Sequence, residues 1–311
     1  MGRPVVFVTR RLALDPAEVL GEALEARVHD GEQLARPALL EAVRGAAGIV
    51  SMLTDRIDEA LLDAAPLLRV VANHAVGIDN IDLAACTRRG LWVTNTPDVL
   101  TEATADLTWA LLLAVARRLR EGEALLRSGR FLGWTPTMLL GRELRGATLG
   151  IYGFGRIGQA VARRAAGFGM RVLSCGRDDG APLSQLLRES DVLTLHAPLT
   201  ARTRHLIGEA QLAQMKPGAL LINTSRGALI DEAALVRALE AGRLGGAGLD
   251  VYEEEPRVHP GLLGRDDVVL LPHLGSATGQ TRARMATLAL SDVRRVLQGE
   301  RPLHPVNAPV A

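Results

Sequence analysis

The sequence predicts an α/β protein that is built from two doubly wound parallel sheets. Short apolar runs rich in Val, Ile and Leu alternate with helical patterns along most of the chain, which is typical of parallel strands joined by crossover helices. A glycine-rich turn follows one such run near the middle of the chain and precedes a helical pattern. The length of 311 residues allows two domains of roughly 150 residues, each with its own core.

The first part of the chain predicts a small parallel α/β domain of the flavodoxin-like type. We expect its strands at 5–8, 48–53, 69–73 and 91–95, and its helices at 16–26, 37–43, 58–64 and 81–89. Asp15 is the expected N-cap of the first helix, and Pro16 suits the first helical position. A Thr-Pro-Asp sequence ends this domain, to which we assign residues 1–98 together with the C-terminal residues 288–311.

The remaining residues, 99–287, predict a larger nucleotide-binding domain. It opens with a long apolar helix at 101–128 and a loop at 129–146, and a final long helix follows Thr278. Its strands are expected at 148–152, 171–175, 191–195, 219–223, 246–250 and 268–271. Six strands with interleaved helices are the pattern of a doubly wound sheet, in which ligands bind at the carboxyl ends of the strands.

Composition excludes several classes of protein. Thirty-six Lys and Arg stand against 35 Asp and Glu, and a net charge of +1 favours neither nucleic acid nor an acidic membrane as a partner. Cys86 and Cys175 are far apart, without disulfide or metal-ligand spacing, which suits a reducing cytoplasm. The N-terminal apolar run is too short for a signal peptide, and the longest one, at 107–116, is too short to cross a bilayer.

Residues 148–177 have the order strand, glycine turn, helix, strand. Gly153, Gly155 and Gly158 stand at G-x-G-x-x-G spacing. The first permits a sharp turn, the second lets backbone approach a pyrophosphate, and the third lets the helix pack on the sheet. A glycine-rich turn without a ligand fits the same letters, but the flanking elements favour a Rossmann cofactor site with phosphates at the helix N-terminus.

The end of the second strand in this unit bears on the choice between NADP and NAD. NAD sites usually carry Asp or Glu there, whereas this strand ends in Gly176 and Arg177. Arg177 can pair with a 2′-phosphate, and its alternative is a loop arginine in solvent. Asp178 and Asp179 follow and argue the other way. We predict NADP as the cofactor, with NAD as the alternative.

Three further stretches lie just past expected strand ends, where such a sheet binds its ligands. They are NTSRG at 223–227, GLDVYEEEP at 248–256 and PHLGSAT at 272–278. Histidine is the side chain whose ordinary pKa best suits proton transfer near neutrality. Of the seven histidines, His273 and His196 both stand at strand ends, so both are candidates.

These motifs, with GFGRIGQAVARRAAGFGMRV, resemble the D-isomer-specific 2-hydroxyacid dehydrogenases over nearly the whole chain. Within that family the chain is most similar to the glyoxylate/hydroxypyruvate reductases. The resemblance implies that the family's catalytic arginine, glutamate and histidine are Arg226, Glu255 and His273. The family glutamate directly precedes proline, which selects Glu255 over Glu253 and Glu254.

The chemistry of a 2-oxo acid explains these residue types. A guanidinium at Arg226 can hold both the carboxylate and the neighbouring ketone. His273 would give the ketone oxygen its proton after hydride arrives from nicotinamide, and Glu255 would favour the charged imidazole and fix its tautomer. The alternatives are a surface ion pair for Arg226, a solvated acid for Glu255 and a satisfied polar residue for His273.

The resemblance implies further contacts. The expected cofactor-binding residues are Gly153, Gly155, Arg156, Ile157, Gly158, Gly176, Arg177, Pro198, Thr203, Thr224, Asp250 and Gly275. The expected substrate-binding residues are Leu53, Val76, Gly77, Ser276 and Trp134, together with Arg226 and His273. Asp250 would hold the nicotinamide carboxamide, Val76 and Gly77 would present N–H groups to the substrate carboxylate, and Trp134 would reach the partner's site. The alternatives are that Asp250 is an acid in a turn, that Val76 and Gly77 form an ordinary tight turn, and that Trp134 anchors a loop.

The sequence thus predicts a cytoplasmic NADPH-dependent reductase of glyoxylate or hydroxypyruvate, acting as a homodimer on a small molecule bound between its domains. A phosphoglycerate dehydrogenase is one alternative, but the turn at 74–79 lacks additional basic residues for a phosphate, and no regulatory domain is added. An NAD(P)-sensing corepressor of the same fold is another, and the lack of an interaction-rich disordered tail disfavours it.

Overall fold

A computed structural model describes residues 2–176 and 180–309, which form two compact units. Unit 1 consists of Met1–Leu100 and Ala277–Ala311, and unit 2 of Thr101–Ser276. The second boundary precedes the one expected at 287, so that all of helix α12 (Gly279–Leu297) belongs to unit 1. The reason is packing, because Ala289, Leu290 and Val293 of α12 are buried in the core of unit 1.

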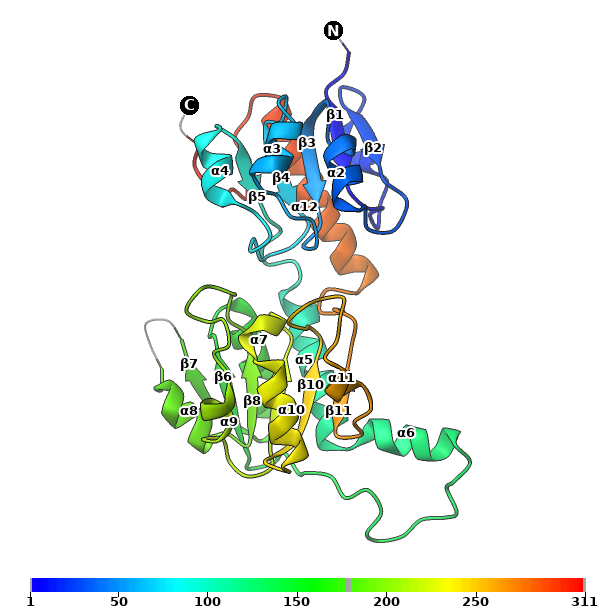
Figure 1. Ribbon diagram of the computed structural model, residues 1–311, viewed down its shortest axis with the longest axis vertical. Coiled ribbons are helices and arrows are strands. Elements are labelled where there is room, and N and C mark those ends of the chain that lie inside the picture. The colour runs from blue at the N-terminus through cyan, green and yellow to red at the C-terminus, as the bar shows by residue number, and fades with distance from the viewer. Residues whose placement is uncertain (1, 177–179, 310–311) are drawn as a thin grey trace. The chain divides into compact units, whose positions relative to one another are not determined.

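Unit 1 is a five-stranded parallel sheet in the order β2-β1-β3-β4-β5, the flavodoxin-like order (Figure 1). Its strands are β1 (Val5–Val8), β2 (Glu25–Val28), β3 (Ala46–Ser51), β4 (Val70–Asn73) and β5 (Trp92–Thr94). Its helices are α1 (Pro16–Leu20), α2 (Arg36–Ala42), α3 (Glu59–Ala64), α4 (Leu83–Arg88) and α12. Helices α2, α3 and α4 pack on one face of the sheet, and α1 and α12 pack on the other.

The expected helix at 16–26 is wrong in its second half. Asp15 caps α1 and Pro16 begins it, as predicted, but the helix ends at Leu20, where Gly21 takes a positive φ of 72°. Residues Glu25–Val28 form the edge strand β2, which pairs in parallel with β1. Most of this strand is exposed, so it lacks the apolar pattern that would have predicted it.

Unit 2 is a six-stranded parallel sheet in the order β11-β10-β9-β8-β6-β7. Its strands are β6 (Thr148–Tyr152), β7 (Arg171–Cys175), β8 (Val192–Leu195), β9 (Ala219–Asn223), β10 (Leu244–Leu249) and β11 (Val268–Leu270). Its helices include α5 (Thr101–Ala116), α6 (Leu119–Arg127), α7 (Arg156–Ala165), α8 (Leu183–Glu189), α9 (Glu209–Leu212), α10 (Glu232–Glu240) and α11 (Pro260–Leu263). All six predicted strands are present. The chain leaves β6 for β7 on one side and later returns to β8 on the other, which makes β6 the switch point of the sheet.

The single helix expected at 101–128 is two helices. Helix α5 ends at Ala116, and Arg118 adopts a left-handed φ of 53° before α6 begins. The Arg142 N–H donates to the Ala116 carbonyl at 2.8 Å, so a distant loop satisfies the end of α5. Helix α5 is largely buried, whereas α6 has no buried residue among those described.

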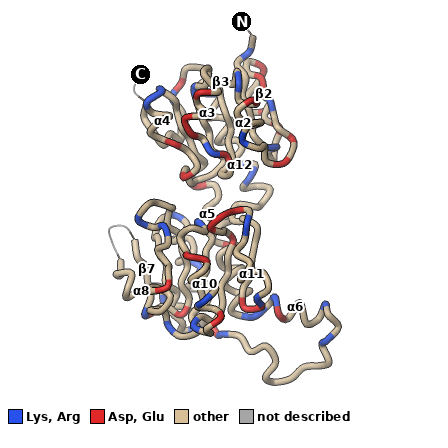
Figure 2. The backbone as a smooth tube through the Cα atoms, in the orientation of Figure 1, with Lys and Arg blue, Asp and Glu red and all other residues tan. Residues whose placement is uncertain are grey.

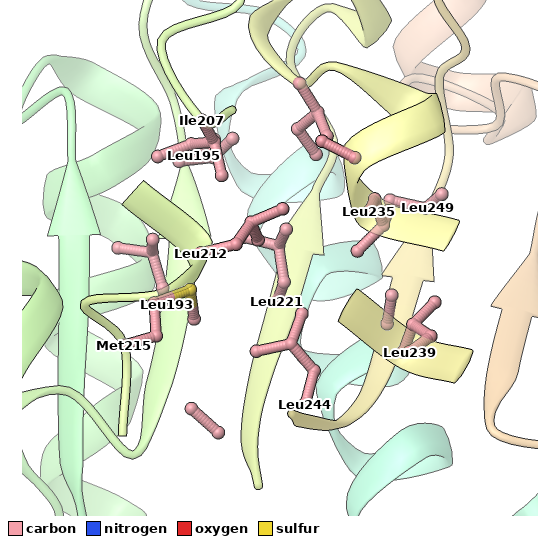
Figure 3. Packing of buried hydrophobic residues seen from close by; sticks show 14 of the residues in the cluster. Leu193, Leu195, Ile207, Leu212, Met215, Leu221, Leu235, Leu239, Leu244 and Leu249 are labelled. Atoms are coloured by element: carbon pink, nitrogen blue, oxygen red, sulfur yellow. The ribbon is translucent and has the colours of Figure 1, made fainter. Parts of the chain in front are cut away.

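The core of unit 2 holds the carboxyl edge of its sheet in place. Figure 3 shows Leu193 and Leu195 of β8 and Leu221 of β9 packed with Leu235 and Leu239 of α10. Full burial of one such leucine side chain contributes about 1.5–3 kcal/mol to folding. Helices α5 and α7 cover the opposite face of the same sheet. The strand ends are therefore anchored from both sides.

Charge is spread evenly over the described chain. Figure 2 shows basic and acidic residues interspersed over the helices and loops of both units. Among the described residues, no three His, Cys, Asp or Glu side chains come together as a potential metal site. No described helix combines the length and the apolarity that crossing a membrane requires.

Candidate active site

The glycine turn after β6 is built as the sequence predicted. Gly153 has a φ of 92°, and a Cβ there would lie 2.6 Å from the carbonyl carbon of His196. A Cβ on Gly158 would lie 2.2 Å from the carbonyl oxygen of Gly153. These two glycines are required by the protein's own packing. A Cβ on Gly155, by contrast, would meet no described atom within 4 Å, so packing does not explain this glycine.

Gly155 is the N-cap of α7, and no described side chain caps that helix. The first N–H groups of a helix carry partial positive charge and attract phosphates. A glycine with no packing requirement, at an uncapped helix N-terminus, fits a pyrophosphate that approaches the backbone closely. The residues present therefore fit a dinucleotide cofactor.

Glu255 and His273 are in direct contact. Glu255 Oε2 lies 2.9 Å from His273 Nδ1, and both side chains are about three-quarters buried. The other oxygen of Glu255 accepts the N–H of Tyr252 at 3.1 Å, which fixes the carboxylate. With Nδ1 donating to the carboxylate, Nε2 is the ring nitrogen that remains for a ligand.

Asp250, which directly follows β10, organises the turn that carries His273. Three successive N–H groups donate to it: His273 to its carbonyl at 2.9 Å, and Leu274 and Gly275 to its carboxylate oxygens at 2.6 and 2.8 Å. The side chain is fully buried, which raises the pKa of Asp250, and the two N–H groups oppose that rise. His273 is held with a φ of 56°, which is unusual for a residue other than glycine.

Arg226 lies in a closed turn after β9. The Asn223 side chain donates to the Arg226 carbonyl at 2.8 Å and accepts the Ser225 N–H at 3.0 Å. A Cβ on Gly227 would lie only 1.8 Å from the carbonyl carbon of Tyr252. The absence of a side chain at Gly227 thus lets the Arg226 turn pack directly against the segment that leads to Glu255.

His196, the rival histidine, has a different environment. Desolvation lowers its pKa to about 3. Its Nε2 lies 2.9 Å from the Thr194 hydroxyl, and its backbone packs against Gly153. A ring that stays neutral down to that pH is a poor proton donor near neutrality, so we assign His196 a structural role.

Other predicted cofactor contacts in unit 2 also lie at the carboxyl edge of the sheet. The Thr203 hydroxyl donates to the Pro198 carbonyl at 2.8 Å and closes the loop after β8. The hydroxyls of Thr224 and Thr108 lie 2.8 Å apart, and Thr104 donates to the Gly275 carbonyl at 3.1 Å. Gly176 directly follows β7, whereas Arg177 and the two following aspartates lie outside the described residues.

The candidates in unit 1 lie on two linked loops. Leu53 follows β3, and Val76 and Gly77 follow β4. Asn73 donates to the Gly77 carbonyl at 2.8 Å, and Asn80 donates to the carbonyls of Met52 and Asp55 at 3.0 and 2.9 Å. Sequence reasoning missed these two asparagines as loop organisers. Asn73 ends β4 and is buried, and a buried amide usually satisfies nearby backbone groups. An asparagine at the end of an apolar strand was the signal that could have identified it.

Two predicted substrate contacts are not part of this hydrogen-bonded arrangement. Ser276 is the last residue of unit 2 and directly follows Gly275. Trp134 lies in the loop between α6 and β6 and is 76% exposed. Its predicted contact is with a second subunit.

The glycine turn at the switch point (Gly153, Gly155 and Gly158), which we call the glycine cradle, lies at the same edge of the sheet as the histidine paired with a carboxylate. Together they define a dinucleotide-dependent oxidoreductase. The protein-family model described as D-isomer specific 2-hydroxyacid dehydrogenase, NAD binding domain, matches residues 109–275. A glyoxylate reductase from Thermococcus onnurineus is 48% identical over 99% of this chain and 97% of its own.

Solved structures agree. The TT0316 protein from Thermus thermophilus matches with a TM-score of 0.94 and 48% identity, over 97% of this chain and 100% of that chain. An NADPH-dependent glyoxylate/hydroxypyruvate reductase from Sinorhizobium meliloti, in complex with NADP and malonate, matches with a TM-score of 0.83 and 35% identity, over 98% and 97%. The chain belongs to the D-isomer specific 2-hydroxyacid dehydrogenases and is an NAD(P)-dependent enzyme, which confirms the resemblance.

Proposed function

We propose that this dehydrogenase reduces glyoxylate or hydroxypyruvate to the D-2-hydroxy acid, with NADPH as the hydride donor and His273 as the proton donor. The 2.9 Å contact between Glu255 and His273 is the observation that carries the proposal, because it pairs a base with its orienting acid. The relatives named glyoxylate reductase support the choice of substrate.

The residues divide the work as follows. The Arg226 guanidinium binds the substrate carboxylate and polarises the ketone oxygen through its planar set of donors. A bound nicotinamide supplies hydride to the carbonyl carbon. His273 Nε2 gives a proton to the carbonyl oxygen, and in the reverse direction it takes the hydroxyl proton. Glu255 stabilises the imidazolium form and keeps Nε2 directed at the substrate.

We assign the remaining contacts as the motifs indicate. Backbone N–H groups of Val76 and Gly77 receive the substrate carboxylate, and Leu53 and Ser276 contact the rest of the molecule. Pro198, Thr203, Thr224, Asp250 and Gly275 lie along the cofactor, and Arg156, Ile157 and the three glycines bind its pyrophosphate. The cradle at Gly155 supports this assignment, since packing leaves that glycine unexplained.

NADPH preference is proposed from Gly176 and Arg177, and the NADP complex of the Sinorhizobium meliloti relative supports it. Arg177→Ala should raise the KM for NADPH at least tenfold and leave the KM for NADH within about twofold, because only NADPH carries the 2′-phosphate. Steady-state kinetics with both cofactors measure this. Equal effects on the two KM values would remove the preference.

A kinetic screen tests the function itself. Glyoxylate, hydroxypyruvate, pyruvate and 3-phosphohydroxypyruvate are assayed with NADPH and with NADH. We expect the highest kcat/KM for glyoxylate or hydroxypyruvate with NADPH. A preference for the phosphorylated acid would indicate a phosphoglycerate dehydrogenase, and cofactor binding without any turnover would indicate a sensor.

We further propose a homodimer in the cytoplasm. Apolar side chains on α6 and the following loop are unusually exposed, among them Leu126 at 63%, Leu132 at 99% and Trp134 at 76%. Exposed apolar surface of this kind marks an interface with another chain. Sedimentation should show a dimer for the parent protein, and Leu132→Asp with Leu126→Asp should yield monomer. A parent protein that sediments as monomer would contradict the proposal.

A further inference from the structure

Glu232 is a buried acid that has no place among the cofactor and substrate contacts assigned above. It is the first residue of α10 and is 7% exposed. Its neighbour Asp231 already caps the helix, accepting the Ala234 N–H at 2.9 Å. Burying a carboxylate is costly unless hydrogen bonds compensate for its lost hydration. The partners of Glu232 therefore show what it does.

Its hydrogen-bond partner comes from the segment that contains Glu255. Glu232 Oε1 accepts the N–H of Glu253 at 2.8 Å. Burial raises the pKa of Glu232, and the backbone N–H groups of Glu253 and His259 oppose the rise because they favour the charged form. The Glu232 carboxylate thus holds segment 253–259 where it begins, at the Tyr252–Glu253 peptide.

The Tyr252–Glu253 peptide is where two candidate catalytic elements meet. A Cβ on Gly227 would lie 1.8 Å from the carbonyl carbon of Tyr252 and 2.4 Å from the backbone nitrogen of Glu253, so the Arg226 turn rests directly on this peptide. The Tyr252 N–H donates to Glu255, which in turn contacts His273. A movement of this peptide would change the position of Glu255 relative to both Arg226 and His273.

The side chain of Glu253 is tied down independently. Arg204 Nη2 lies 2.9 Å and His205 Nε2 lies 2.5 Å from Glu253 Oε1. These contacts with Arg204 and His205 are exposed to solvent, whereas the contact with Glu232 is buried. The segment therefore keeps an anchor when Glu232 is changed, and a folded variant is expected.

We propose that Glu232 is a positioning residue, which sets the placement of Glu255 against His273 by holding the Tyr252–Glu253 peptide. The inference rests on the proposed roles of those three residues. Its effect should fall on kcat, because a displacement of about 1 Å in a catalytic group can cost up to a hundredfold in rate. The glycine cradle belongs to other elements, β6 and α7, so cofactor affinity should be preserved.

The test compares Glu232→Ala and Glu232→Gln with two control variants on the same helix. Asp231→Ala removes the helix cap but leaves segment 253–259 untouched, and Glu240→Ala changes an exposed acid at the other end of α10. We expect Glu232→Ala to lower kcat at least tenfold with the Kd for NADPH within twofold. Glu232→Gln keeps an acceptor oxygen but loses the charge that strengthens the hydrogen bond, so it should lower kcat by less than Glu232→Ala but by more than about threefold. Both controls should stay within twofold.

A second readout does not depend on turnover. The ring ¹⁵N chemical shifts of His273 report its hydrogen bond to Glu255, and Glu232→Ala should shift them while Asp231→Ala does not. Unchanged ring shifts together with kcat within twofold of the parent protein would overturn the proposal. So would a loss of kcat that Asp231→Ala matches, because helix stability would then explain it.

The two proposals can fail separately. A parent protein that turns over none of the 2-oxo acids contradicts the proposed function, and the ring shifts of His273 still decide whether Glu232 positions Glu255. If Glu232→Ala does not fold, the isosteric Glu232→Gln decides by the same readout, since losing the negative charge weakens the hydrogen bond from the Glu253 N–H. Ring shifts and kcat equal to those of the parent protein in Glu232→Gln would then overturn the proposal.

Discussion

At the scale of single residues, Asp250 does more than the sequence predicted for it. The motif suggested a contact with the nicotinamide carboxamide, and that contact stays a prediction. The structure shows that both carboxylate oxygens and the carbonyl of Asp250 accept N–H groups from the His273 turn. A left-handed non-glycine residue typically costs about 1–3 kcal/mol, so the surroundings must hold it. Asp250 supplies the three hydrogen bonds that hold His273.

Replacing the candidate proton donor tests the assignment at this scale. His273→Ala should lower kcat by at least a hundredfold, because general acid–base catalysis by one side chain typically contributes about 10²–10⁴-fold. The Kd for NADPH, followed by fluorescence titration, should change little. His29→Ala is a suitable control, since His29 belongs to unit 1, where its ring hydrogen-bonds to the Glu32 carbonyl and has no part in the proposed chemistry. A His273→Ala variant within tenfold of the parent kcat would exclude the role.

At the scale of elements, the β6–turn–α7 unit separates what packing requires from what a ligand requires. Gly153 and Gly158 would bring a Cβ within 2.6 Å of backbone atoms, whereas Gly155 would not contact the described protein. Gly155 also has a φ of −75°, which any residue can adopt. The motif therefore contains two glycines that packing requires and one glycine, Gly155, that packing leaves unexplained.

The matched pair Gly155→Ala and Gly158→Ala distinguishes these reasons. Gly155→Ala should leave the melting temperature nearly unchanged and weaken NADPH at least tenfold, because its Cβ would meet the pyrophosphate. Gly158→Ala should lower the stability by about 1–3 kcal/mol, because its Cβ would overlap the Gly153 carbonyl. Thermal unfolding and cofactor titration of both variants provide the measurements. Normal NADPH affinity in Gly155→Ala would place the cofactor elsewhere.

At the scale of the whole molecule, unit 1 is assembled from both ends of the chain. Helix α12 packs on its sheet, and the tail that follows returns to β5, where Thr94 bridges Pro305. The fully buried Asp292 of α12 holds this tail, accepting the N–H groups of Leu303 and His304 at 2.7 and 3.2 Å and contacting the His304 ring at 2.9 Å. Unit 2 is the segment between these two parts.

Asp292→Ala should therefore destabilise the protein by about 2–4 kcal/mol, because it leaves buried N–H groups without their acceptor. Thermal or urea unfolding would show the effect on the transition of unit 1. Asp266→Ala is the control, since Asp266 is exposed and forms a surface pair with Arg120, which contributes at most about 1 kcal/mol. Equal stability of the two variants would mean that the tail does not depend on Asp292.

Prediction from the sequence succeeded where the physical signal is local. Inner strands of a parallel sheet are buried on both faces and appear as continuous apolar runs, which is why β1, β6 and β9 were located to the residue. It failed at β2, because an exposed edge strand has no apolar pattern. It also failed at the end of α5, where the N–H of Arg142, in a loop distant in sequence, hydrogen-bonds to the last carbonyl of the helix. Glu232 was not recognised, because its partner Glu253 is 21 residues away.

The sequence by itself determined the family, the parallel sheets, the glycine cradle and the identity of the candidate catalytic residues, because each depends on residue types at short, regular spacing. The tertiary structure decided how those residues are held. Asp250 organises the His273 turn, Gly227 seats the Arg226 turn against Tyr252, and α12 belongs to unit 1. These are contacts between distant segments, and their energies depend on burial and approach distances that arise only when the chain has folded.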